Sequence, residues 1–187
     1  MEADLDRLRK ALSELDECWR ELDVPLSRNT APGIDAVTVQ KAFADLGLHP
    51  PAEIVTWFAW HDGVVDSDVP LIQIETGIDD FAPMPLCANV EDVKMHREIN
   101  LNIFPDGGDC ACWRDEWFQF AVAGNGTALV VNCSVPEGAV TPIREYYRDD
   151  NALEEVVHYP SLTQMAEEWV KRLREGSGEF WNPQYSE

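Results

Sequence analysis

The sequence contains no hydrophobic run that could cross a membrane. None of its apolar stretches approaches the roughly 18 consecutive residues of a transmembrane helix. The N-terminal stretch MEADLDRLRK is charged and follows a helical pattern, unlike the apolar core of a secretory signal. We therefore expect a soluble protein of the cytoplasm.

Basic residues are scarce. The 187 residues include 14 Lys and Arg against 35 Asp and Glu, which gives a formal net charge of −21 at pH 7. Nucleic acid is therefore excluded as an expected ligand, because proteins neutralise phosphate backbones with Lys and Arg, and anionic membranes are disfavoured by the same argument. No Lys or Arg occurs from residue 42 to residue 93, whereas ten Asp and Glu do. Such a stretch favours a docking surface for a basic protein, and solubility is the alternative explanation.

Cysteines are few and odd in number, so they do not indicate a disulfide framework. The five are Cys18, Cys87, Cys110, Cys112 and Cys133. In a secreted domain one thiol would be left over, so reduced thiols in a cytosol are the simpler account. Cys110 and Cys112 are one residue apart, a shorter spacing than zinc sites and redox motifs use. We expect no metal and no cofactor; a thiol- or metal-dependent enzyme using Cys110, Cys112 and His96 is a weaker alternative.

Catalytic motifs are also missing from the sequence. His61 and Asp62, in the stretch TWFAWHDG, are the clearest candidates for an acid–base pair. We expect them on a helix, where adjacent side chains point about 100° apart and do not pair. No Ser or Cys lies in the context of a nucleophile elbow, and the Gly-rich stretches lack the Lys-Ser/Thr of a phosphate loop. The expected protein is a binder and not an enzyme.

Periodic apolar residues predict helices in the first third of the chain and at its end. They recur every three or four positions from about residue 4 to residue 22, which predicts an amphipathic helix. A loop over 26–33 follows, and Asp35 then caps a second helix that ends at Gly47. Ser161 caps a closing helix.

A third helix is predicted through AEIVTWFAWHDG. Pro51 is suited to its first position, because proline at the start of a helix loses no hydrogen bond. Trp57 and Phe58 lie on its apolar face, and Gly63 would end it as a left-handed cap. This prediction makes His61 part of the last helical turn.

Alternating and apolar runs predict strands in the middle of the chain. WFQFAVA and TALVVNC are joined across GNG, where Asn125 and Gly126 favour a tight hairpin turn. Further strands are predicted in VPLIQIET, AVTPIREYY and LEEVVHY. The order of elements predicts an α+β fold with a mainly antiparallel central sheet packed with helices. We expect an N-terminal helix over 1–25 packed on a domain over 26–176, followed by a tail over 177–187.

The stretch TAPGIDAVTVQKAFADLGLHPPAEIVTWFAWHDG resembles the N-terminal signature of the SUKH superfamily. That group joins fungal cell-wall synthesis regulators to bacterial toxin-immunity proteins. WFQFAVAGNGTALVVNC is similar to its strand–turn–strand, and YPSLTQMAEEWVKRL to its closing helix, so the resemblance covers residues 26 to 176. The residues that mark it are Pro32, Gly33, Trp57, Phe58, Gly63, Trp117, Asn125 and Gly126.

The resemblance implies a SUKH-like fold with an added N-terminal helix and no enzymatic activity. A bacterial member would bind and neutralise a cognate toxin, often a basic nuclease; a regulator or scaffold in cell-envelope synthesis is the alternative. Together with the negative net charge, the resemblance implies that the partner is a protein, a basic toxin domain. We expect acidic loop residues to bind it. The candidate residues are Asp66, Asp68, Asp79, Asp80, Asp106 and Asp109.

Overall fold

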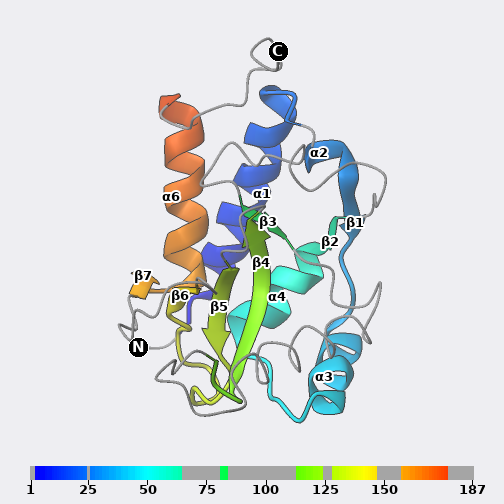
Figure 1. Ribbon diagram of the computed structural model, residues 1–187. Helices are drawn as coiled ribbons and strands as arrows, with labels where there is room; N and C mark the ends of the chain where they lie inside the picture. The colour runs from blue at the N-terminus through cyan, green and yellow to red at the C-terminus, as the bar shows by residue number, and fades with distance from the viewer. Residues whose placement is uncertain are drawn as a thin grey trace, which may run out of the picture.

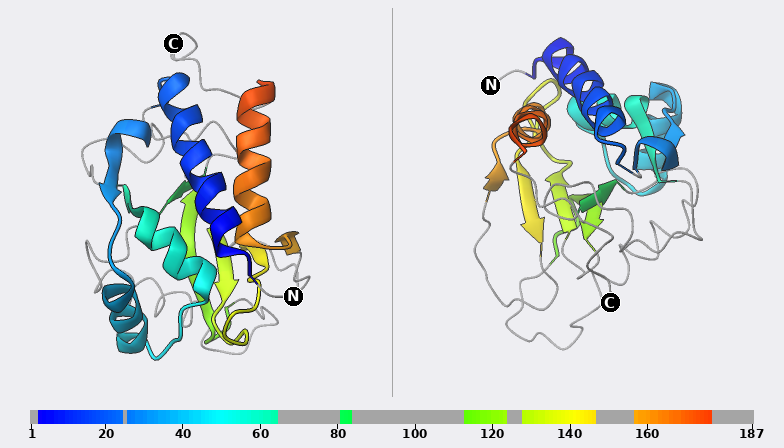
Figure 2. Two further views of the ribbon diagram at one scale, coloured as in Figure 1. Left: turned by 180° about the vertical axis from the view of Figure 1, so that it is seen from behind. Right: turned by 90° about the horizontal axis from the view of Figure 1, so that it is seen from above.

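The computed structural model describes residues 3–24, 26–64, 81–83, 113–123, 128–146 and 157–176. Three helices cover one face of a five-stranded antiparallel sheet whose strand order is β3-β4-β5-β6-β7 (Figures 1 and 2). The helices are α1 (Leu5–Glu21), α4 (Ala52–Trp60) and α6 (Leu162–Glu175). The strands are β3 (Phe81–Pro83), β4 (Trp117–Ala123), β5 (Ala128–Asn132), β6 (Ile143–Tyr146) and β7 (Val157–Tyr159). The predicted α+β class with a mainly antiparallel sheet is confirmed.

Smaller elements lie beside this main body. They are α2 (Leu26–Asn29), β1 (Thr30–Pro32), α3 (Ala36–Asp45) and β2 (His61–Val64), with β1 and β2 paired as a two-stranded antiparallel sheet. The prediction of a plain loop over 26–33 was therefore wrong. The Ser27 side chain and backbone N–H both bond the carbonyl of Val24, which turns the chain into a short helix.

Side-chain caps begin the predicted helices. Asp35 accepts hydrogen bonds from the N–H of Thr38 at 2.9 Å and from its hydroxyl at 3.0 Å, which starts α3. These bonds lower the pKa of the Asp35 carboxyl, the backbone bond from Thr38 being the largest cause. The Ser161 hydroxyl accepts from the N–H of Gln164 at 3.0 Å and starts α6, which ends at Gly176 with φ of 65°. Both predicted caps are confirmed.

The prediction for the third helix was wrong at both ends. Pro51 is the residue before the first turn, and α4 begins at Ala52. The helix ends at Trp60, because His61 has extended backbone angles (φ −146°, ψ 139°) and begins β2. Gly63 does have a positive φ of 70°, as a left-handed cap would, but it lies inside the strand.

The central hairpin follows the predicted strand pattern. Trp117 of β4 lies opposite Asn132 of β5, and Val122 lies opposite Ala128, with an irregularity between Gln119 and Ala121. The turn that joins the strands, with Asn125 and Gly126, lies outside the described residues, as does the strand predicted in VPLIQIET. Within the predicted strand AVTPIREYY, residues 143–146 form β6. Within the predicted strand LEEVVHY, residues 157–159 form β7.

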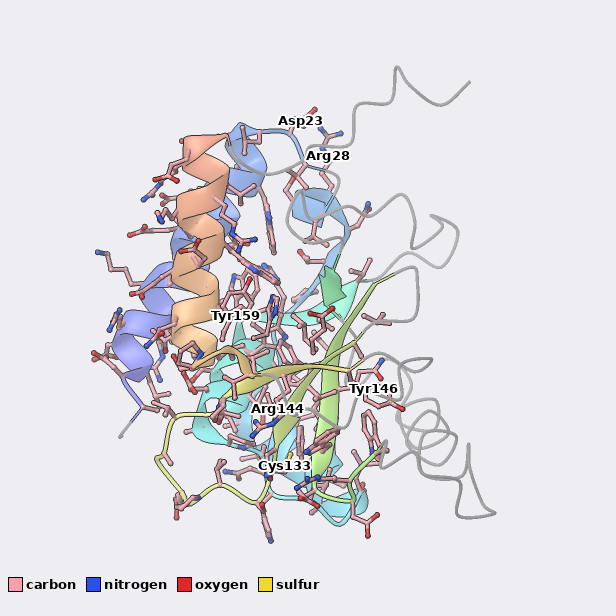
Figure 3. The ribbon with its side chains drawn as sticks, turned by 60° about the vertical axis from the view of Figure 1, so that its left-hand side comes forward. Asp23, Arg28, Cys133, Arg144, Tyr146 and Tyr159 are labelled. Carbon is pink, nitrogen blue, oxygen red and sulfur yellow. The ribbon has the colours of Figure 1, made fainter. Side chains whose placement is uncertain are left out.

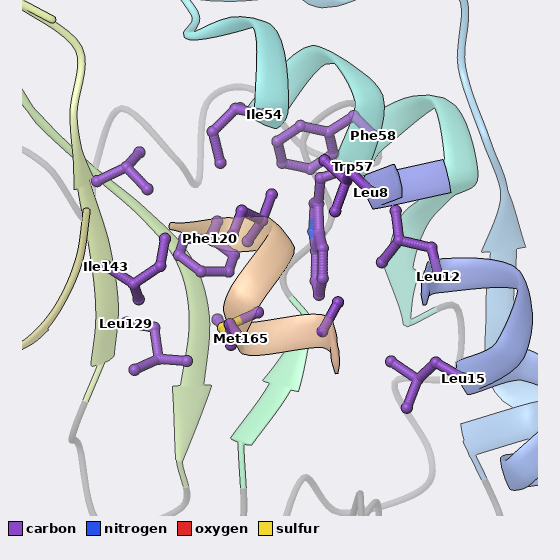
Figure 4. Packing of buried hydrophobic residues seen from close by; sticks show 14 of the residues in the cluster. Leu8, Leu12, Leu15, Ile54, Trp57, Phe58, Phe120, Leu129, Ile143 and Met165 are labelled. Carbon is purple, nitrogen blue, oxygen red and sulfur yellow. The ribbon is translucent and has the colours of Figure 1, made fainter. Parts of the chain in front are cut away.

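The core lies between the three helices and the sheet (Figure 4). Trp57 and Phe58 of α4 are fully buried, as predicted, and Trp57 packs edge-on against Phe120 of β4. Helix α1 contributes an amphipathic stripe, and its buried residues confirm the predicted pattern: Leu8, Ala11, Leu12, Leu15, Cys18 and Trp19. A smaller cluster is formed by Trp113, Trp117, Ala128, Val130 and Tyr146. The alternation of strand residues places it on the sheet face opposite the helices.

Helices α1 and α6 come from opposite ends of the described chain and lie side by side in parallel (Figures 1 and 2). Arg7 donates two hydrogen bonds to Glu167, each 2.5 Å long. One heptad further along both helices the charges are exchanged, and Arg174 donates to Glu14 at 3.0 Å. The two pairs place complementary charges opposite one another at each level of the two helices.

Candidate functional site

A groove of about 800 Å³ lies where α4 begins, a volume within the range of small-ligand and peptide pockets. Its walls come from the start of α1, from α3, from the step before α4, from α4 itself and from residues 133–137. Cys133, which is labelled in Figure 3, directly follows the end of β5 and begins the wall formed by residues 133–137. Segments that are distant in the sequence therefore converge on this one hollow.

The groove walls are mainly apolar and contain three prolines. Pro50 and Pro51 form the step before α4, and Pro136 lies in the segment across the groove. Proline fixes φ near −65° and so restricts how far the walls can rearrange. The polar residues of the lining include Arg9, whose guanidinium bonds Asp6 at 2.6 Å. The others are Gln40, His49, Thr56, Ser134 and Glu137.

Residues 133–138, which form one wall, are held at both ends by hydrogen bonds. The N–H of Ala3 donates to the carbonyl of Gly138 at 2.7 Å, which ties the segment to the chain entering α1. At the other end, Asn132 accepts from the N–H and the hydroxyl of Ser134 at 2.7 and 2.6 Å. The wall is thus preformed, so a ligand would order little of it on binding.

A buried carboxylate in the first turn of α4 connects this end of the helix to other parts of the chain. Glu53, in the first turn of α4, is 0% exposed and accepts from the N–H of Thr141 at 2.6 Å. It also accepts from the N–H of Thr163 at 3.1 Å and from its hydroxyl at 2.9 Å, at the first turn of α6. A carboxylate is favourable there because helix N-termini present unpaired N–H groups and a positive dipole end. Glu53 therefore joins α4, the segment after the groove wall and α6.

His61 is also engaged in structural contacts. Its Nδ1 lies 3.0 Å from the carbonyl oxygen of Ala31, and its Nε2 lies 3.0 Å from Oδ1 of Asp16. The second oxygen of Asp16 accepts from the indole of Trp60 at 2.8 Å. Both ring nitrogens thus face acceptors within the protein, and His61 fastens β2 to β1 and α1. The carboxylate that His61 contacts is thus that of Asp16, and the predicted helical placement of His61 and Asp62 was wrong, because both lie in β2.

The excess of acidic residues is concentrated outside α1 and α6. These two helices carry eight acidic and seven basic residues, half of all the basic residues in the chain. The rest of the chain holds 27 acidic and seven basic residues. Because the two helices are neighbours, they form one face on which charges of both signs are nearly balanced, and the other residues of the sequence carry nearly all of the net charge.

A second groove, of about 550 Å³, runs between α1 and α6. Ala11 and Val170 line it together with charged residues of both signs. Arg7 and Arg174 are committed to the interhelical ion pairs, and Lys10 lies 3.5 Å from Glu14. We assign this groove to the packing of the two helices.

Two cysteines are described, and both are buried. Burial raises the pKa of the Cys18 thiol, an effect that the nearby charge of Arg174 partly offsets. Cys133 is buried where it lines the groove. Cys87, Cys110, Cys112 and His96 lie outside the described residues. Within the described ranges, no three His, Cys, Asp or Glu residues are grouped as metal ligands.

The predicted partner-binding residues lie outside the part of the chain that the structure describes. This holds for Asp66, Asp68, Asp79, Asp80, Asp106 and Asp109, and for Asn125 and Gly126 of the predicted turn. They stay predictions. Glu53 and the groove were missed by sequence reasoning; the Pro50–Pro51 step was the one local signal of the groove, and a Glu in a first helical turn gives none.

The Pro32–Gly33 motif has a clear steric role. Gly33 follows β1 and passes directly over the end of α4, where an added Cβ would lie 2.0 Å from the carbonyl oxygen of Ala59. This approach lets the N–H of Ile34 donate to the carbonyl of Phe58 at 2.9 Å. Only glycine fits, because any side chain would collide with the backbone of α4.

Comparisons with known proteins give no assignment. No protein-family model matches the chain, and no curated protein matches it significantly. Among the described residues, no helix has the length and apolar character needed to cross a membrane.

Proposed function

We propose that this chain is a non-enzymatic binding protein of the cytoplasm, an immunity protein that binds and neutralises a toxin with a basic surface. The proposal rests on one observation, the surplus of carboxylates and its location. If every basic residue paired with one acid, 21 acidic side chains would still lack a cationic partner, as the net charge requires. A basic protein surface would supply such partners.

The ion pairs within the chain make this argument stronger. Seven basic residues of the described part form ion pairs with Asp or Glu, and six of these seven lie on α1 or α6. Most basic side chains that pair with acids of the same chain therefore lie on α1 and α6, the two helices whose charges are nearly balanced. The acidic remainder is left to act on partners, and it would steer a basic protein toward itself and raise its association rate by roughly 10- to 1,000-fold at low salt.

Neutralisation would follow from occupation of the toxin's own binding surface. A nuclease binds phosphates through clustered Lys and Arg, and carboxylates on a protein surface can occupy the same positions. No bond needs to form or break in the toxin. The expected consequence is competition, in which bound immunity protein excludes the nucleic acid substrate.

The test begins by examining whether the gene beside this one encodes a toxin-like domain, whose product then serves as the partner. Stopped-flow association should slow steeply as salt rises, and the double variant Asp79→Lys with Asp80→Lys should slow it at low salt. The matched control is Glu17→Lys with Glu21→Lys, two exposed positions on α1, which should leave the rate nearly unchanged. Equal slowing by both double variants would reject a localised acidic docking surface. Absence of binding, with cell-envelope synthesis proteins co-purifying instead, would favour the regulator alternative.

A further inference from the structure

We propose that the groove at the start of α4 receives an extended segment of the basic partner, placing an apolar side chain between the prolines and a basic side chain beside Glu137. This inference rests on the proposed function for the charge of the partner. The groove itself is defined by the structure alone, through its volume and its walls.

The apolar residues that line the groove favour an apolar side chain as its occupant. Leu5, Val55 and Val135 line the groove together with its prolines, so an apolar side chain placed there would lose water-exposed surface. Because residues 133–138 are pinned by hydrogen bonds at both ends, the protein would spend little conformational entropy on binding. A preformed apolar groove with a few polar groups is the usual form of a recognition site.

The start of α4 adds hydrogen-bond donors. Pro51 precedes the first turn and supplies no side-chain cap, so the first N–H groups of α4 receive no hydrogen bond from their N-cap residue. Ala52, which carries one of these N–H groups, lines the groove. A backbone carbonyl of a docked segment is the matching acceptor, which favours a peptide over a purely apolar ligand.

The charge of the lining selects a basic segment. Glu137 is exposed and has no ion pair with any of the described residues. Arg9, which also lines the groove, bonds Asp6 at 2.6 Å, so its charge is already compensated. A Lys or Arg of the partner would therefore find an uncompensated carboxylate at Glu137, in the strongly acidic part of the chain.

The experiment uses the full chain and a display library of random short peptides as the probe. Ser134→Trp fills the groove from an exposed position, and Ser13→Trp on the exposed side of α1 is the matched control. Enriched peptides should combine Lys or Arg with a neighbouring apolar residue. Their affinity should fall about tenfold or more with Ser134→Trp, a loss of roughly 1.4 kcal/mol, and stay unchanged with Ser13→Trp. Glu137→Lys, a second variant that leaves the groove walls intact, should lower the affinity of the enriched peptides by a similar factor.

Three outcomes would overturn the inference. They are a failure to enrich peptides, enrichment of peptides without basic residues, and equal binding to the wild type and Ser134→Trp. The same variants are then measured with the toxin. A toxin that binds wild type and Ser134→Trp equally rejects the groove but leaves the proposed function in place. A toxin that does not bind, while basic peptides do enter the groove, rejects the proposed function alone.

Discussion

Arg7 and Glu167 form a two-pronged ion pair between α1 and α6, across a sequence separation of 160 residues. Both side chains are partly exposed, and hydrogen bonding to Glu167 is the largest cause that raises the pKa of Arg7. We predict that Arg7→Glu and Glu167→Arg each lower the melting temperature, and that the double variant restores most of it because the pair is re-formed with exchanged charges. The coupling should be small and should nearly vanish in about 1 M salt, where the Debye length is about 3 Å.

That double-mutant cycle has an internal control in the second pair. Glu14→Arg combined with Arg174→Glu exchanges the charges one heptad away. Mixing one variant from each pair with the overall charge kept, such as Arg7→Glu with Glu14→Arg, should give no restoration. Restoration by mismatched variants would show that only the overall charge matters.

Glu53→Ala should be among the most destabilising single changes. It removes a buried acceptor from the N–H groups of Thr141 and Thr163, and unsatisfied buried donors cost about 1–3 kcal/mol each. Chemical unfolding should show a loss of about 3 kcal/mol or more in the free energy of unfolding. Glu53→Gln should also destabilise, because its NH2 group faces donors.

Added formate or acetate should partly rescue Glu53→Ala by restoring a carboxylate in the cavity. The matched control is Ile54→Ala, which also creates a cavity at a fully buried position but exposes no polar donors. It should lose stability without being rescued. Equal rescue of both variants would mean that the anion acts on the protein generally.

Gly33→Ala should destabilise more than Gly138→Ala. The added Cβ at Gly33 collides with the carbonyl of Ala59, whereas at Gly138 it meets no atom within 4 Å but must adopt φ of 76°. Left-handed backbone costs a non-glycine residue about 1–2 kcal/mol, whereas overpacking costs about 1–3 kcal/mol and more in severe cases, such as this 2.0 Å approach to backbone. Thermal unfolding followed by circular dichroism measures both, and a reversed order would contradict the close approach over α4.

The cap of α3 gives a prediction for pH. The pKa of Asp35 is lowered in the folded state, so its contribution to stability is present above the unfolded pKa and is lost as pH falls through the folded value. Asp35→Ala should therefore lose stability at neutral pH, and its difference from wild type should shrink in acid. Ser161→Ala removes the neutral cap of α6 and should cost about 1 kcal/mol at every pH. Parallel pH dependence for both variants would contradict an ionised cap at Asp35.

The sequence predicted those features whose causes are local. The caps at Asp35 and Ser161 act on residues three positions away, and the stripe on α1 repeats within one helix. Glu53 could not be predicted in the same way, because its partners lie 88 and 110 residues further along the chain. The end of α4 was misplaced for the same reason: His61 is held by Asp16, 45 positions before it, which no local pattern reveals. The groove is likewise assembled from separate segments.

The pairing of α1 with α6 also has a consequence for synthesis. At roughly 5–20 residues per second, the ribosome adds Glu167 on the order of ten seconds after Arg7. During that interval the apolar stripe of α1 has no helix α6 to cover it. The part of the stripe that packs on α6 therefore stays uncovered until α6 itself has been made, whereas α4, which also packs on α1, emerges much earlier.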